Sequence, residues 1–275
     1  MSKTWFITGT AAGLGRLLTE RLLARHDRVV ATVRRPGSLD DLTERYGSRL
    51  RVISLDLTDT AAIKTVVAEA FNALGRIDRI VSNAGYGLFG AAEELTDAQI
   101  DRQIATNLTG SIHLIRAVLP YLRRQGGGRI VQLSSEGGQI AYPDFSLYHA
   151  TKWGIEGFVE SVAQEVAAFN IDFVLVEPGP TETNFGAGLD VAEPLACYGP
   201  TVAGEFRRAL LTGSFDIKGD ADRTVDAMLQ VLDQPQPPLR LPLGSAAYDH
   251  ITQALTQRLA LASQQKKLAY SADKE

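Results

Sequence analysis

Tyr148 and Lys152 place a phenol and an ammonium four positions apart in the segment Tyr148-His149-Ala150-Thr151-Lys152. On a helix, side chains at i and i+4 project from the same face, about one turn apart. A cation held beside a phenol favours the phenolate and lowers the tyrosine pKa from its ordinary value of about 10. The pair therefore predicts a tyrosine that donates a proton in one direction of a reaction and accepts it in the other.

A serine ends a β-rich run thirteen positions before this tyrosine. In an open α/β sheet, ligands bind outside the carboxyl ends of the strands, which is where Ser135 falls. Its hydroxyl is a candidate to hydrogen-bond a substrate oxygen. A tyrosine and a lysine at this spacing also occur on many exposed helices, and Ser134-Ser135 with Gly137 and Gly138 also suits an ordinary turn. Only the combination of serine, tyrosine and lysine indicates chemistry.

A glycine-rich segment near the N-terminus follows a β-rich run and precedes an apolar helical pattern. Glycines permit a tight turn and let backbone N–H groups approach a pyrophosphate at a helix N-terminus. This position between a strand and a helix predicts a dinucleotide-binding loop. The residues expected to contact the cofactor are Gly9, Thr10, Ala12, Gly13, Leu14 and Gly15.

The end of the second β-rich run indicates which dinucleotide is bound. An NAD-type site usually carries an acidic residue there to bind the ribose 2′-hydroxyl. The chain has no acidic residue from Arg28 to Pro36, and two arginines, Arg34 and Arg35, stand in its place. Guanidinium groups form charge-assisted bonds to a 2′-phosphate, so we expect NADP(H) in preference to NAD(H). The alternative is that both arginines are solvated loop charges.

Short β-rich runs alternate with longer helix-periodic segments, which is typical of a parallel sheet with crossover helices. The runs are nearly continuous in Val, Ile and Leu, as expected when helices cover both faces. We therefore expect an α/β fold: a single doubly wound Rossmann domain, residues 1–275, with a mostly parallel six- or seven-stranded sheet. The expected strands are Trp5 to Thr8, Arg28 to Val33, Leu50 to Leu55, Ile80 to Asn83, Arg129 to Ser134 and Asp172 to Glu177, with Pro238 to Leu243 as a possible edge strand.

Polar N-caps and glycine C-caps mark the expected helix ends. Ser38 is placed to cap a helix that stops at Gly47, and Asp59 to cap one that stops at Gly75. A third, long helical pattern runs from Thr96 toward Arg124 and opens with capping-box spacing to Gln99.

The segment of about residues 181–218 breaks the alternation with several Gly and Pro residues. A loop region this long in a compact domain is usually functional, and we expect a substrate loop there, with Phe185 to Pro200 closing as a lid. A further helix is expected from Asp220 to Leu232, and a loose polar tail from about Ser263.

Composition excludes several classes of function. The net charge of −4 offers no basic stripe for a nucleic acid, and no apolar run is long enough to cross a membrane. Met1 to Thr10 lacks the pattern of a secretory signal, so a cytoplasmic location is expected. Cys197 is the only cysteine, and the histidines show no ligand spacing, so no metal is expected.

Taken together, these motifs resemble the short-chain dehydrogenase/reductase family, over roughly Lys3 to Leu189. The resemblance rests on the order and spacing of the glycine loop, Asn83-Ala84-Gly85, Asn107, Ser135, Tyr148 with Lys152, and Pro178-Gly179. One departure is Ser82, where the family often has a first asparagine. The residues Val176 to Gly179 and the extra C-terminal length look most like the branch of 17β-hydroxysteroid and retinol dehydrogenases.

The resemblance implies a role for each matching residue. Ser135 would orient the substrate carbonyl, Tyr148 would exchange the proton, Lys152 would bond the nicotinamide ribose and shift the tyrosine pKa, and Asn107 would hold a water that links the lysine to solvent. Asp56 would meet the adenine, and Thr183 the carboxamide. The other expected cofactor contacts are Leu57, Asn83, Ala84, Gly85, Pro178, Gly179 and Thr181. The family also implies a homodimer or homotetramer.

Aromatic residues near the strand ends predict an apolar or aromatic carbonyl or alcohol as substrate. Those expected to contact it, besides Ser135 and Tyr148, are Tyr86, Tyr142, Phe145 and Phe185, with Leu88, Phe89, Gln139 and His149 nearby. Two alternatives stay open: a regulator that senses NADPH without turnover, which has no use for a Ser–Tyr–Lys set, and a sugar-nucleotide epimerase, which usually has a differently spaced glycine loop and a larger C-terminal domain.

Overall fold

The computed structural model describes residues 2–274 and contains one seven-stranded sheet in the order β3-β2-β1-β4-β6-β7-β9. Every neighbouring pair in this sheet is parallel. The order reverses at β1, so the fold is doubly wound. The strands are β1 (Thr4–Thr8), β2 (Arg28–Val33), β3 (Leu50–Ser54), β4 (Arg79–Ser82), β6 (Gly128–Leu133), β7 (Ile171–Pro178) and β9 (Arg240–Leu243).

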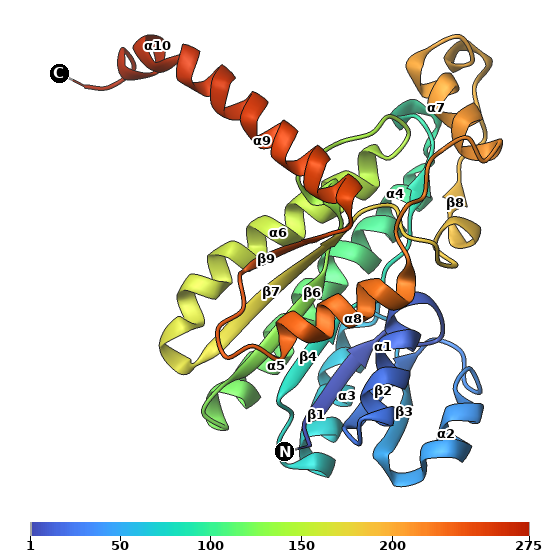
Figure 1. Ribbon diagram of the computed structural model, residues 1–275, viewed down its shortest axis with the longest axis vertical. Helices are drawn as coiled ribbons and strands as arrows, with labels where there is room; N and C mark the ends of the chain where they lie inside the picture. The colour runs from blue at the N-terminus through green and yellow to red at the C-terminus, as the bar shows by residue number, and fades with distance from the viewer. Residues whose placement is uncertain (1, 275) are drawn as a thin grey trace.

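Helices cover both faces of the sheet (Figure 1). On one face, α3 (Thr60–Leu74), α5 (Gly110–Arg124) and α6 (Ser146–Val166) bury apolar side chains against sheet residues such as Phe6 and Ile80. On the other, α1 (Gly13–Ala24), α2 (Asp40–Tyr46) and α8 (Ala221–Leu232) pack on residues such as Trp5 and Ile7. Because both faces are buried, the strands read as continuous apolar runs, and the expected strands are confirmed to within about two residues at each end.

Two of the three expected helix starts are capped as predicted. Asp59 accepts a hydrogen bond from the Ala62 amide at 2.9 Å, and Thr96 forms a capping box with Gln99. The prediction for Ser38 is wrong. The Ser38 hydroxyl donates to the Arg35 carbonyl at 2.7 Å, so it closes a local turn, and α2 begins at Asp40 without a side-chain cap.

The long helix expected from Thr96 to Arg124 is divided by one π-helical turn. It consists of α4 (Asp97–Ile104), the π-turn Ala105–Thr109 and α5. Such turns inside α-helices are frequent at functional sites, and this one contains Asn107.

The segment expected to form a substrate loop leaves the sheet after β7 and returns at α8. It contains β8 (Asp190–Val191), which pairs with β5 (Leu88–Phe89), and α7 (Val202–Leu211). The chain from Ser263, expected to be loose, is helical: α9 (Ser245–Gln264) and α10 (Lys266–Tyr270) project from the body of the molecule (Figure 1). None of the helices in residues 2–274 is long and apolar enough to span a membrane.

Candidate active site

The serine, tyrosine and lysine that are predicted to carry the chemistry lie at the carboxyl end of β6 and the start of α6. Ser135 is the second residue after β6, and its hydroxyl oxygen accepts a hydrogen bond from the Gly137 amide at 3.0 Å. Tyr148 and Lys152 lie one turn apart on α6, and the lysine Nζ is 5.5 Å from the centre of the tyrosine ring. The short helix η4 (Glu136–Gly138) follows the serine and packs against α6. Strand end and helix start therefore bring hydroxyl, phenol and ammonium together.

The surroundings of Tyr148 favour its neutral form. Burial raises the pKa of the Tyr148 phenol to about 12; hydrogen bonding with the Ser135 hydroxyl opposes the rise, and the charge of Glu136 adds to it. The protein alone thus holds the phenol as a proton donor, contrary to the lowering of the tyrosine pKa that the sequence predicts from Lys152. A positive charge supplied at this site from outside the chain would favour the phenolate.

Lys152 is buried, and its ammonium donates to the Leu133 carbonyl at 2.9 Å. Burial lowers the pKa of the Lys152 ammonium to about 8, and the charge of Glu156 limits that fall. An ammonium has three donors, and one of them is used by this contact. Lys152 therefore retains donors for a ligand beside Tyr148.

Asn107 uses its side chain to fix the loop after β4. Its Oδ1 accepts from the Tyr86 amide at 3.1 Å, and its Nδ2 donates to the Tyr86 carbonyl at 2.8 Å. The backbone carbonyl of Asn107 accepts the Ser111 hydroxyl at 3.1 Å. The structure thus shows a positioning contact for the asparagine, and a water relay through it stays a prediction.

The glycine loop lies between β1 and α1. Its glycines occupy positions where a side chain would be strained by the backbone conformation or would clash with a neighbour. Gly9 and Gly13 have φ of 70° and 59°, in the region that glycine tolerates best. A side chain on Gly15 would overlap the Asn83 amide and the Gly9 carbonyl. Asn83 Nδ2 donates to the carbonyls of Thr8 at 2.8 Å and Gly9 at 2.9 Å, so it braces this loop. The glycine loop therefore forms a cradle for a ligand group that must approach the backbone closely at a helix N-terminus.

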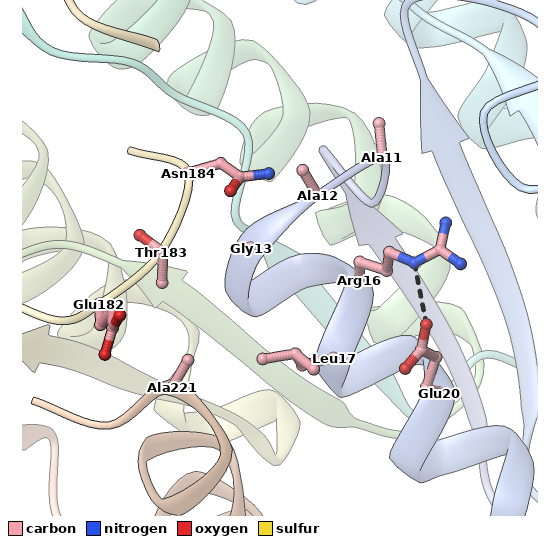
Figure 2. A pocket seen from close by; sticks show the side chains of 10 residues that line it. All are labelled: Ala11, Ala12, Gly13, Arg16, Leu17, Glu20, Glu182, Thr183, Asn184 and Ala221. Atoms are coloured by element: carbon pink, nitrogen blue, oxygen red, sulfur yellow. Dashed lines mark hydrogen bonds and ion pairs between the residues drawn. The ribbon is translucent and has the colours of Figure 1, made fainter. Parts of the chain in front are cut away.

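A pocket of about 380 Å³ adjoins this loop (Figure 2). It is bounded by the start of α1 on one side and by Glu182, Thr183 and Asn184 of the segment after β7 on the other. Thr183 faces Gly13, because a Cβ built on the glycine would lie 3.9 Å from that of the threonine. Thr183, predicted to bind the cofactor, therefore lies beside the glycine loop.

Arg34 and Arg35 are exposed at the end of β2. Within residues 2–274, no hydrogen bond or ion pair engages either guanidinium group. Arg16, which sequence reasoning missed, holds the loop that follows: it donates to the Ser38 carbonyl at 3.2 Å and pairs with Asp41 at 2.5 Å. The sequence gives one clue to this role, a long cation directly after Gly15.

The remaining predicted cofactor contacts lie at the same edge of the sheet. Asp56 is exposed after β3, and hydrogen bonds from Thr58 lower the pKa of its carboxyl, against some burial and with help from the charge of Arg34. Leu57 is buried in the core, which leaves its backbone as the part able to face a ligand. The others end strands or begin the loops after them: Ala84, Gly85, Pro178, Gly179 and Thr181.

The predicted substrate residues divide into two groups. Phe145 and Phe185 touch Tyr148, with ring centres 5.8 and 5.6 Å away. Tyr142 does not line an open space: its ring stacks on Phe206 at 5.7 Å, and its hydroxyl donates to Glu136 at 2.6 Å. The other nearby residues are packed or bonded within the protein: Tyr86 by its backbone to Asn107, Gln139 to Glu177, His149 to Gly137, and Leu88 and Phe89 in the core.

An aromatic cluster that sequence reasoning missed covers this region. Phe206 on α7 and Phe215 after it pack edge to face at 5.6 Å and both contact Tyr142. Arg207, next to Phe206, forms ion pairs with Glu94 and Asp144, both fully buried side chains. α7 and its flanks therefore pack over this region from within the expected substrate loop of residues 181–218, while Phe185 of the expected lid contacts Tyr148, and closure of that lid stays a prediction.

Comparison with known proteins gives one consistent result. The family model for short chain dehydrogenases matches residues 3–193. Oxidoreductase BOA17 of Botryotinia fuckeliana is 37% identical over 256 residues, 92% of this chain and 93% of that protein. Human retinol dehydrogenase 8 is 33% identical over 255 residues, 86% of this chain and 80% of that one. The crystal structure of a short-chain dehydrogenase from Streptomyces avermitilis has 37% identity and a TM-score of 0.91, and the match covers 99% of this chain and 98% of that chain.

Proposed function

The chain belongs to the short-chain dehydrogenase/reductase family of NAD(P)-dependent oxidoreductases, and we propose that it interconverts a carbonyl and an alcohol with NADP(H). One observation supports this most strongly: Ser135, Tyr148 and Lys152 meet at the carboxyl edge of the sheet, where only β4 separates β6, which leads to the serine, from β1, which leads to the glycine loop. An NADPH-sensing regulator needs the glycine loop but makes no use of a buried lysine beside a tyrosine.

The residues present fit a dinucleotide. The glycine cradle at the start of α1 offers backbone N–H groups to a pyrophosphate, and Arg34 and Arg35 offer guanidinium groups to a 2′-phosphate. Lys152 has donors for the ribose of the nicotinamide, and Thr183 lies next to Gly13 for its carboxamide. When bound, the cofactor supplies or accepts a hydride.

Within this site each side chain has a distinct task. Ser135 donates its hydroxyl hydrogen to the substrate oxygen and so polarises the carbonyl. Tyr148 gives its phenolic proton to that oxygen during reduction and takes it back during oxidation. Lys152 stabilises the phenolate that reduction leaves behind, and Asn107 relays replacement protons through a water.

The walls of the site favour an apolar or aromatic substrate. Rings surround Tyr148 and Tyr142: Phe145, Phe185 and the cluster of Phe206 and Phe215. Arg207, next to Phe206, is paired with Glu94 and Asp144. A relative that is named a retinol dehydrogenase agrees with an apolar alcohol as substrate. An epimerase is disfavoured, because the substrate side within residues 2–274 is covered by α7 and its flanks, which form a short segment.

A panel of apolar and aromatic aldehydes, ketones and alcohols, followed by nicotinamide absorbance, tests the proposal. We expect turnover of at least one class, with NADPH preferred to NADH. If NADPH binds tightly and no carbonyl or alcohol is turned over, the regulator is favoured in its place. Faster turnover with NADH would contradict the cofactor preference and leave the reaction class intact.

A further inference from the structure

A buried ionic cluster lies behind the serine, tyrosine and lysine. Glu156 on α6 and Glu177 on β7 have side chains that are 2% and 0% exposed. Arg240 on β9 bonds both, at 2.5 Å each, and also pairs with the half-exposed Glu160 at 2.9 Å. Buried carboxylates are costly unless paired, so this cluster needs an explanation beyond surface solvation.

The cluster supports the loop that contains Ser135. We call residues 134–139 the serine loop. The Ser134 hydroxyl donates to Glu156 Oε1 at 2.5 Å, and Gln139 Nε2 donates to Glu177 Oε2 at 2.6 Å. No side chain fits on Gly138, because its Cβ would overlap the Glu156 carboxylate. The two ends of the serine loop thus rest on two carboxylates that Arg240 holds together.

The same carboxylate acts on Lys152. Glu156 follows the lysine by four positions on α6, on the same helix face, and its charge raises the pKa of the Lys152 ammonium against the effect of burial. Burial raises the pKa of both carboxyls, that of Glu177 to about 7, and Arg240 opposes the rise in each. When both glutamates are ionised, their charges balance those of Lys152 and Arg240. The charge that acts on Lys152 is that of Glu156, and the other titratable and charged groups of the cluster and the serine loop come from α6, η4, β7 and β9: Tyr148, Glu160, Glu136, Glu177 and Arg240.

We propose that Glu156 is a positioning residue for the reaction: its carboxylate fixes the serine loop and supplies the negative charge that keeps Lys152 an ammonium. It acts through Ser135 and Lys152 and does not touch the substrate. The inference rests on the proposed function for its kinetic consequences, whereas its electrostatic part is a property of the ligand-free protein.

The substitution Glu156→Gln tests the charge, because glutamine keeps an acceptor for Ser134 and Arg240. In the ligand-free protein, the titration of Lys152, followed by NMR of ¹³Cε-labelled lysine, should move down from about 8 by about one pH unit. Glu160→Gln, which removes an exposed carboxylate that pairs with Arg240, should leave the titration of Lys152 unchanged. Equal titrations in wild type and Glu156→Gln, or an equal shift in Glu160→Gln, would overturn the electrostatic role.

Kinetics test the consequence for catalysis. In Glu156→Gln the alkaline limb of the kcat profile should move to lower pH, with about a fivefold loss at pH 8 that largely recovers at pH 6. Ser134→Ala, which removes the loop contact and keeps the charge, should lower kcat several-fold at all pH values. A profile for Glu156→Gln that falls uniformly, together with a lower Tm, would indicate a merely structural residue.

Two controls keep the outcomes distinct. If the wild-type protein turns over no substrate of the panel, the proposed function fails, while the lysine titration still decides the role of Glu156. If Glu156→Gln does not fold, ¹³Cδ-labelled glutamate in the wild-type protein decides it. A Glu156 carboxyl that is protonated at pH 7 could not supply the required charge and would refute the inference.

Discussion

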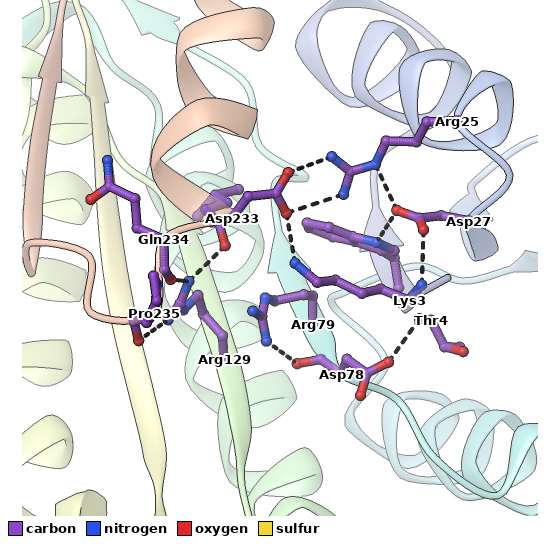
Figure 3. A network of polar contacts seen from close by, with 12 residues as sticks. Lys3, Thr4, Arg25, Asp27, Asp78, Arg79, Arg129, Asp233, Gln234 and Pro235 are labelled. Carbon is purple, nitrogen blue, oxygen red and sulfur yellow. Dashed lines mark hydrogen bonds and ion pairs between the residues drawn. The ribbon is translucent and has the colours of Figure 1, made fainter. Parts of the chain in front are cut away.

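Buried charged side chains lie at both ends of the seven-stranded sheet, where the strands begin and where they end. At the amino ends, Arg129 is buried, binds Asp172 through two nitrogens and donates to the carbonyl of Leu232. It also donates to the carbonyls of Gln234 and Pro235 (Figure 3). At the carboxyl ends, Lys152 is equally buried and donates within residues 2–274 to one carbonyl.

The amino-end network matches most of its charges. Asp27 accepts hydrogen bonds from the Lys3 amide, the Trp5 indole and Arg25, and Asp233 accepts from Lys3 and Arg25. One atom departs from this pattern: the buried Nε of Arg79 has no partner in the described chain. These contacts tie β1, α1 and the end of α8 together, which is a structural task.

At the carboxyl ends of the strands, burial shifts the pKa values of several ionisable groups away from their ordinary values. Burial raises the pKa of Tyr148 to about 12 and lowers that of Lys152 to about 8. Burial also raises the pKa of Glu177 to about 7, aided by the charge of Glu156 and opposed by Arg240. Burial of a charge is therefore no mark of function by itself. What distinguishes the carboxyl end is that Lys152 combines unused donors with a pKa of about 8, close enough to neutral pH for a ligand to change its charge.

The largest effect should come from Tyr148→Phe. Loss of the phenolic proton donor should lower kcat by about 10²- to 10⁴-fold, while the NADPH Kd and Tm stay close to wild type. Tyr121→Phe on α5 is the matched control, since its ring contacts Phe71 and Arg124 and its hydroxyl makes no hydrogen bond within residues 2–274. Steady-state kinetics and fluorescence titration measure both variants. A Tyr148→Phe enzyme with undiminished kcat would remove the acid–base role.

At the opposite end of the sheet, Arg129→Met should lower the stability of the fold and leave catalysis unchanged. It leaves several buried carbonyls without donors, so the free energy of unfolding should fall by about 2–5 kcal/mol in urea titrations. The kcat, measured well below the Tm, should stay near wild type. Arg116→Met, an exposed arginine on α5, is the control and should change neither quantity. A large fall in kcat of the folded Arg129→Met protein would break the contrast between the two ends.

The regular part of the fold could be predicted because its pattern is local. Strands buried on both faces show as apolar runs, and caps such as Asp59 act within a few residues. Ser38 misled the prediction because two backbone groups compete for its hydroxyl, and the Arg35 carbonyl is the one it reaches. No local sequence pattern predicts the π-turn at Asn107.

The Ser135, Tyr148 and Lys152 set could be predicted from spacing, because a strand end and one helical turn fix it. Phe206 and Phe215 could not, since their contact with Tyr142 joins segments more than sixty positions apart. The ion pairs of Arg240 with Glu156 and Glu177 are equally distant in the chain. What sequence missed is therefore the set of long-range contacts that hold the predicted residues in place.

Arg34→Asp sharpens the comparison for an exposed part of the carboxyl end. The Arg34 guanidinium has no partner in residues 2–274, so its replacement should change the stability of the fold little. The substitution should weaken NADPH binding by about tenfold to a hundredfold. The NADH Kd should change far less, because NADH has no 2′-phosphate. Arg51→Asp, another exposed arginine on β3, is the control for net charge. Equal weakening of both cofactors by Arg34→Asp would refute the 2′-phosphate assignment.

The smallest effect should come from Asp233→Asn at the amino end. Despite some burial, hydrogen bonds from Arg25 and Lys3 lower the pKa of the Asp233 carboxyl, and the side chain is 40% exposed. Solvent screening limits its contribution to less than about 1 kcal/mol. Because the folded pKa lies below the unfolded one, the contribution is complete above the ordinary pKa of about 4 and is lost as pH falls through the folded value.

Urea unfolding of wild type and Asp233→Asn at a series of pH values measures this contribution. The difference in the free energy of unfolding should be constant near neutral pH and shrink below about pH 4, with no change in kcat at pH 7. If that difference grew as the pH fell, the carboxyl would be destabilised by its neighbours, and the amino-end network could not be the matched set of charges that separates it from the active end.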